Sequence, residues 1–122
     1  MEVTSEKNRK AGELSFTFIY PLYLQKIEKK GRTVNELNKT IQWLTGFNES
    51  QIKKMLKEET TFKEFFEKAI INPKAHLIKG VICGYRIERI QESFELYRNC
   101  RYLDKLVDEL SKGKELKKIL RP

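Results

Sequence analysis

The residues best suited to chemistry lie within one short stretch, residues 76–86. His76 is the only histidine of the chain, and Cys83 stands directly before a glycine. An imidazole close to a thiol is the pairing that activates a cysteine nucleophile. With Tyr85 and Arg86 alongside, this stretch predicts the pocket of a small enzyme or ligand-binding protein. The competing interpretation is structural, because a lone histidine after a helix start more often caps the helix or lies on the surface.

A second source of function is the positive charge. The chain has 25 Lys and Arg against 17 Asp and Glu, a formal net charge of +8. Such an excess is typical of a protein that meets phosphate or another anionic surface, although it also serves solubility alone. Our leading hypothesis is therefore a non-enzymatic binding or interaction module for an anionic partner, either a nucleic acid or an acidic protein. The basic candidates are residues 26–32, Lys53, Lys54, Lys57, Lys114, Lys117 and Lys118.

Residues 45–48 read as a short glycine-containing turn between two helices, as in a helix-turn-helix unit. Lys53, Lys54 and Lys57 would then lie on the second helix, which is the helix that enters the DNA groove in such units. Trp43 precedes the turn and falls beside the apolar stripe of the first helix. It would either cover one side of the core or, if exposed, stack on a base or fill a pocket of a partner.

Several functional classes are not expected from this sequence. Cys83 and Cys100 lack the spacing of a zinc site, and no second histidine is available. Asp104 and Asp108 stand one helical turn apart and could hold a cation, but ordinary surface ion pairs explain them better. We therefore expect no metal and no cofactor. No apolar run is long enough to cross a bilayer and no export segment opens the chain, which indicates a cytoplasmic protein without a membrane span.

Capping signals divide the chain into helices. Thr33, Asn48 and Thr61 are each followed three residues later by Glu or Gln, which is the spacing of a capping box. Apolar periodicity predicts further helices near residues 16–30 and 93–112. Residues 1–12 are polar without such a period, so we expect a flexible N-terminal arm there and a single helical domain over residues 13–122. The predicted fold is all-α, a compact irregular (orthogonal) bundle of about five or six helices, with a short extended segment as an alternative near Val81–Cys83.

The last helix carries a regular apolar stripe. Leu96, Cys100, Leu103, Val107 and Leu110 alternate steps of four and three residues, as in a heptad pattern. A stripe of this kind can face the core of its own chain or a second copy. Self-association through residues 96–110, giving a homodimer, is therefore a third functional hypothesis.

Four separated motifs resemble a known bacterial family. They are Tyr-Pro-Leu-Tyr-Leu-Gln-Lys at residues 20–26, Trp-Leu-Thr-Gly at 43–46, Ile-Lys-Gly-Val-Ile-Cys-Gly at 78–84 and Arg-Tyr-Leu-Asp-Lys-Leu-Val-Asp-Glu-Leu at 101–110. In this order they resemble domain of unknown function 2200, over a span from about residue 16 to residue 121. The resemblance implies a mostly helical, cytoplasmic bacterial protein. It carries over no catalytic or binding residue.

Overall fold

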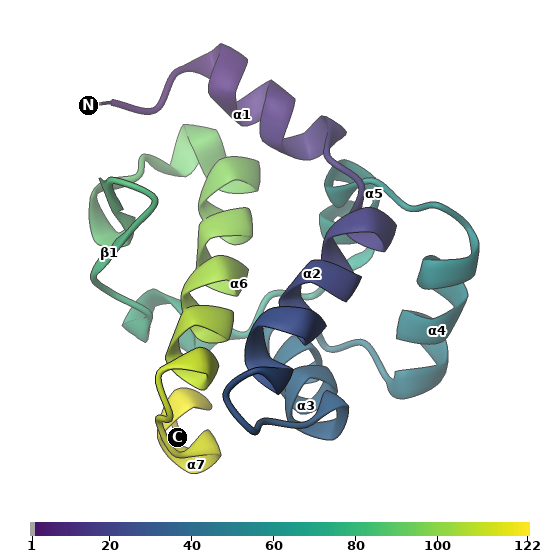
Figure 1. Ribbon diagram of the computed structural model, residues 1–122. Helices are drawn as coiled ribbons and strands as arrows, with labels where there is room; N and C mark the ends of the chain where they lie inside the picture. The colour runs from purple at the N-terminus through teal and green to yellow at the C-terminus, as the bar shows by residue number, and fades with distance from the viewer. Residues whose placement is uncertain (1) are drawn as a thin grey trace.

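A long helix, α6 (Glu95–Ser111), lies at the centre of the structure (Figure 1). The computed structural model describes residues 2–122. α6 contacts α1, α2, α3, α5 and α7 because its buried residues cover a broad face rather than a narrow stripe. These buried apolar residues are Tyr97, Cys100, Tyr102, Leu103, Leu106, Val107 and Leu110.

Six further α-helices complete the bundle within the described residues. The three capping boxes form as the sequence predicts: the side chains of Thr33, Asn48 and Thr61 each accept a hydrogen bond from the backbone N–H three residues on. The all-α bundle is confirmed, with seven α-helices in the described chain instead of five or six. Besides α6 they are α1 (Ser5–Glu13), α2 (Phe16–Glu28), α3 (Val34–Thr45), α4 (Glu49–Lys57), α5 (Phe62–Lys68) and α7 (Leu116–Ile119).

The N-terminal segment differs from the expected flexible arm outside the core. Met1 lies outside the described residues, but from Ser5 onward the chain is helical and packs against α5 and α6. The buried residues of α1 are Ala11 and Gly12, and a Cβ atom added at Gly12 would collide with Leu96 Cδ2. Since small residues face the interface, this helix has no periodic large apolar side chains to reveal it in the sequence.

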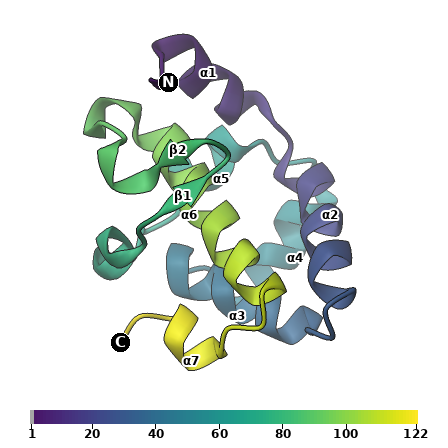
Figure 2. The same ribbon diagram turned by 60° about the vertical axis from the view of Figure 1, so that its left-hand side comes forward.

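Short elements connect α5 to α6. They are the 3-10 helix η1 (Pro73–Leu77), strands β1 (Val81–Ile82) and β2 (Tyr85–Arg86), and the 3-10 helices η2 (Ile87–Arg89) and η3 (Glu92–Phe94). β1 and β2 form an antiparallel hairpin that lies against α6 (Figure 2). Its two turn residues, Cys83 and Gly84, have φ angles of +53° and +82°, as a two-residue turn between twisted strands requires. The extended segment expected near residues 81–83 is therefore confirmed.

A cluster of phenylalanines joins the start of α2 to α5. The rings of Phe16 and Phe65 stack with their centroids 4.3 Å apart, and both side chains are fully buried. The Phe16 N–H donates to the Thr60 carbonyl and the Phe62 N–H donates to the Leu14 carbonyl, each at 2.8 Å. This short bridge anchors one end of α2, whose other end carries the basic residues 26–32.

Candidate functional site

Two basic segments that lie far apart in the sequence meet at one end of the bundle. The end of α2, the loop to α3, the end of α6 and α7 gather at the bottom of Figures 1 and 2. Residues 26–36 and 108–122, which we call the basic end, carry nine Lys or Arg and five Asp or Glu side chains. They therefore account for +4 of the formal net charge of +8.

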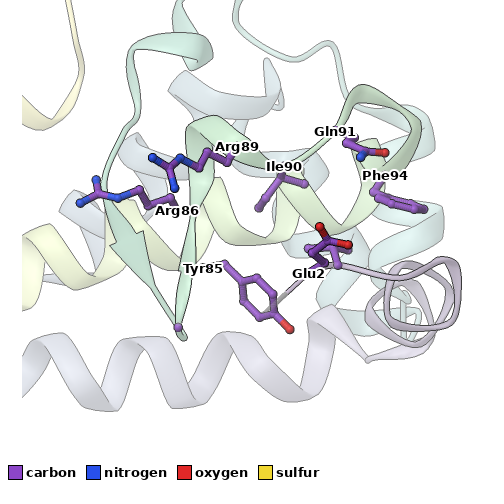
Figure 3. A pocket seen from close by; sticks show the side chains of 9 residues that line it. Glu2, Tyr85, Arg86, Arg89, Ile90, Gln91 and Phe94 are labelled. Carbon is purple, nitrogen blue, oxygen red and sulfur yellow. The ribbon is translucent and has the colours of Figure 1, made fainter.

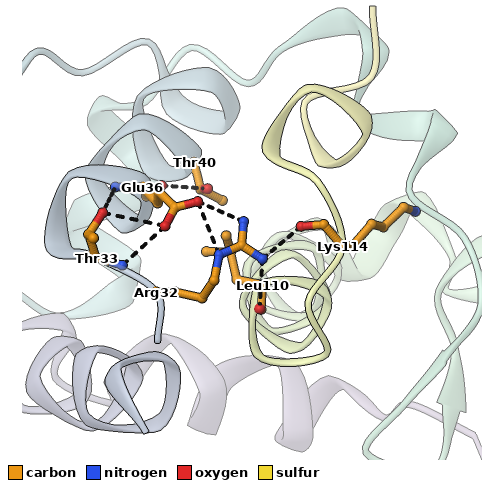
Figure 4. A network of polar contacts seen from close by, with 6 residues as sticks. All are labelled: Arg32, Thr33, Glu36, Thr40, Leu110 and Lys114. Carbon is orange, nitrogen blue, oxygen red and sulfur yellow. Dashed lines mark hydrogen bonds and ion pairs between the residues drawn. The ribbon is translucent and has the colours of Figure 1, made fainter. Parts of the chain in front are cut away.

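Arg32 holds the two segments together (Figure 4). Its Nε and Nη2 atoms donate to Glu36 Oε2 at 3.0 and 2.7 Å. Its Nη1 atom donates to the carbonyl oxygens of Leu110 and Lys114, at 3.1 and 2.7 Å. Carbonyl groups at the end of a helix have no partner within the helix and carry partial negative charge, so a guanidinium is well suited to bind them. The contacts fix the α2–α3 loop against the end of α6.

The negative charge of Glu36 is paired with groups of the same loop. Its carboxylate accepts the two hydrogen bonds from Arg32 and also one from the backbone N–H of Thr33, at 3.2 Å. The hydrogen bond from Arg32 is the main cause that lowers the pKa of Glu36, with Thr33 adding to it. Glu36 is therefore ionised at neutral pH and paired within the protein.

Two acidic side chains near the end of α6 are recessed, whereas the neighbouring lysines project. Asp108 and Glu109 side chains are only 14% and 11% exposed, but the Lys112 and Lys26 side chains are 72% and 50% exposed. Asp108 pairs with Lys112 at 3.0 Å and with Lys26 at 3.6 Å. A carboxylate placed beneath two ammonium groups keeps their positions close while the positive charge faces the solvent.

The C-terminal tail is part of the same surface. Ile119 of α7 is fully buried, and Arg121 donates to both carboxylate oxygens of Glu109 at 2.7 and 2.8 Å. The tail therefore docks on the core. The predicted site residues Lys114, Lys117 and Lys118 are exposed. A surface depression lies between α2 and the tail, lined by Lys30, Ser111, Lys112 and Gly113.

The predicted lysines of α4 form a separate patch. Lys53, Lys54 and Lys57 line a shallow depression with Glu49 and Ser50, on the side of the molecule far from α7 (Figure 1). Lys54 also lies 3.9 Å from Glu58. Glu49 and Glu58, at the two ends of α4, thus offset much of this charge.

Trp43 does not provide an exposed stacking surface. It is half-buried and packs against the core cluster, so it covers one side of the core. Its carbonyl accepts a hydrogen bond from the Asn72 side chain at 3.1 Å.

The residues of the predicted enzyme pocket are only partly brought together. His76 is exposed on η1, where its Nδ1 atom lies 2.7 Å from the Pro73 carbonyl oxygen. Cys83 is exposed at the hairpin turn, and neither His76 nor Cys83 lines the cavity that Tyr85 and Arg86 share. Tyr85 and Arg86 do line a cavity of about 390 Å³ (Figure 3). Outside residues 76–86 the cavity is lined by Glu2, Val3, Arg89, Ile90, Gln91 and Phe94, which the sequence analysis did not identify. Arg89 and Phe94 lie in single-turn 3-10 helices, which have no periodic signal.

Nearly the whole chain matches a known protein family. The family model for domain of unknown function 2200, described as an uncharacterized protein conserved in bacteria, matches residues 10–121. The chain belongs to this family. The resemblance found in the four motifs is thereby confirmed.

This member of domain of unknown function 2200 has a solved structural neighbour. It is similar to the uncharacterized protein SP1917, whose crystal structure superposes with a TM-score of 0.84 at 35% sequence identity. The match covers 92% of this chain and 91% of that chain. No curated protein matches the sequence. The whole basic end except residue 122 lies within the part that the family model matches.

In this family member the apolar stripe of α6 is used within the chain. Cys100, Leu103, Val107 and Leu110 are buried in the core, and burial raises the pKa of the Cys100 thiol to about 12. Self-association through residues 96–110 would require opening that core, so the stripe offers no ready interface. A homodimer would have to use another surface.

The acidic pair of the same helix is occupied by ordinary partners. Asp104 accepts hydrogen bonds from the Tyr23 hydroxyl and from Arg101, both at 2.5 Å. Burial, and next the charge of Asp104, raise the pKa of Tyr23 well above its usual range. Across residues 2–122 no three metal-ligating side chains converge, and no helix is long and apolar enough to cross a membrane.

Proposed function

We propose that the protein is a non-enzymatic binding module whose basic end binds the phosphate backbone of a nucleic acid. The observation that carries the proposal is the sorting of charge at this end: Asp108 and Glu109 are recessed and paired, while the surrounding lysines project into solvent. A surface of this kind attracts a polyanion and releases the counterions around its phosphates.

The composition of the basic end favours contact with the backbone over reading of bases. Residues 26–36 and 108–122 contain no Phe, Tyr or Trp, so no ring is available to stack on an unpaired base. The cationic groups that project are lysine ammonium groups, which act as flexible point charges. Phosphate contacts position a protein on a duplex but carry no sequence information. Binding should therefore depend on salt and not on sequence.

The test is a fluorescence anisotropy titration of the full chain against a labelled DNA duplex of about 20 base pairs over a range of salt concentrations. The logarithm of the association constant should fall linearly with the logarithm of the salt concentration, by about 0.9 for each phosphate contacted. A triple variant of the basic end, Lys29→Gln, Lys30→Gln and Lys112→Gln, should bind more weakly and show a slope smaller by about three.

The matched control is Lys53→Gln, Lys54→Gln and Lys57→Gln, which removes the same charge from α4. Its affinity for the duplex should stay within about twofold of the parent value, because these three lysines lie outside the proposed surface. Equal loss in both triple variants would contradict the location of the site. If the protein bound polyglutamate but not the DNA duplex, its partner would be an acidic protein and not a nucleic acid, and the proposal would be refuted.

A further inference from the structure

The cavity beside the hairpin lies apart from the basic end. It is formed by residues 2–3 of the N-terminal segment, the hairpin residues 84–86, residues 89–91 and Phe94 (Figure 3). Its volume of about 390 Å³ is large enough for a small organic molecule. The surface proposed to bind nucleic acid does not include this cavity.

One part of the cavity wall is cationic. Arg86 and Arg89 both line the cavity and are exposed. Arg86 lies 3.7 Å from Glu88, a loose ion pair, and the guanidinium of Arg89 makes no hydrogen bond or ion pair with any residue that the structure describes. In Figure 3 both guanidinium groups extend toward the same side of the view. Two such forks with spare donors are suited to a carboxylate or phosphate group.

Another part of the wall is apolar. Ile90, Phe94 and Val3 of the N-terminal segment contribute the apolar side chains of the cavity wall. Ile90 is nearly fully buried, while Phe94 and Val3 are half-buried and keep part of their apolar surface available. A ligand that fits both parts of the wall has an anionic group at one end and a flat apolar body at the other.

We propose that this cavity binds a small aromatic anion, with its phosphate or carboxylate group on Arg86 and Arg89 and its ring against Ile90 and Phe94. The arginine contacts give charge recognition, and the apolar wall selects for the ring. Glu2 also lines the cavity and brings a negative charge that opposes anion binding. Replacing Glu2 by glutamine should therefore strengthen binding.

The test is a titration of the isotope-labelled full chain with phenyl phosphate, followed by amide chemical shifts and, for affinity, by calorimetry. Saturable shifts should centre on residues 84–94. Arg89→Gln should weaken binding about tenfold or more, because it removes charge-assisted hydrogen bonds. Glu2→Gln should strengthen binding, and Phe94→Ala should weaken phenyl phosphate more than it weakens inorganic phosphate. Benzoate in place of phenyl phosphate distinguishes a carboxylate ligand from a phosphate ligand.

The matched control is Arg9→Gln, an exposed arginine on α1 that does not line the cavity. It should leave the affinity unchanged. Absence of saturable shifts up to millimolar phenyl phosphate, or an equal loss in Arg9→Gln and Arg89→Gln, would overturn the proposal. The triple lysine variant of the basic end should keep its affinity for phenyl phosphate, so the two proposals fail independently.

Discussion

Replacement of Arg32 by alanine should destabilise the whole fold and not just the α2–α3 loop that contains this residue. The side chain is only 12% exposed and donates four hydrogen bonds, two to Glu36 and two to carbonyl oxygens at the end of α6 and beyond it. A hydrogen bond to a charged group contributes about 1.5–3 kcal/mol, and a buried acceptor left unpaired adds a further cost. Because water would reach part of the vacated site, we expect a loss of about 3 kcal/mol in the free energy of unfolding.

Thermal unfolding followed by circular dichroism measures this loss. With an unfolding entropy of about 2.1 cal/mol/K per residue, a loss of this size lowers the Tm of a domain of this length by about 10 °C. Arg32→Lys should recover part of the loss, because one ammonium group can still pair with Glu36 but does not span both carbonyl groups.

The control is Arg9→Ala. Arg9 forms the same kind of pair, with Glu13 one helical turn away, but its side chain is 59% exposed. Its removal should change stability by less than about 0.5 kcal/mol. Equal Tm values for Arg32→Ala and Arg9→Ala would refute the view that Arg32 joins the two segments of the basic end.

Three further predictions concern acid stability, thiol reactivity and packing of the N-terminal helix. Because Arg32 lowers the pKa of Glu36, this carboxylate contributes full stability above its ordinary pKa of about 4.5 and loses it as the pH falls through the lower folded value. Glu36→Gln should therefore flatten the decline of urea midpoints below pH 4.5, and an unchanged decline would contradict this. At pH 8 an aromatic disulfide reagent should modify one thiol rapidly in the native chain, exposed Cys83, and none in Cys83→Ser, because Cys100 is buried. A fast thiol in Cys83→Ser would contradict the burial. Gly12→Val should cost about 2 kcal/mol in urea unfolding by overpacking the α1–α6 contact, whereas an unchanged midpoint would mean that α1 does not pack there.

The sequence by itself determined the features that arise within a few residues of chain. Each capping box at Thr33, Asn48 and Thr61 joins a side chain to a backbone group three residues away, so the residue types are sufficient to place these helix starts. The all-α class and the extended segment near residues 81–83 follow from the same local preferences. The four motifs show which family the chain belongs to, but they identify no catalytic or binding site.

Only the tertiary structure decided which of these local elements act together. Arg32 and Leu110 are separated by 78 positions, and no local pattern indicates that a guanidinium of one segment binds a carbonyl of the other. The recessed position of Asp108 and Glu109 is likewise a property of packing, because acidic residues in a sequence are ordinarily expected on the exposed surface. The helix α1 is buried through small residues, which the hydrophobic period does not detect. The proposed basic end and the cavity at Arg86 and Arg89 therefore became visible only when long-range packing brought their parts together.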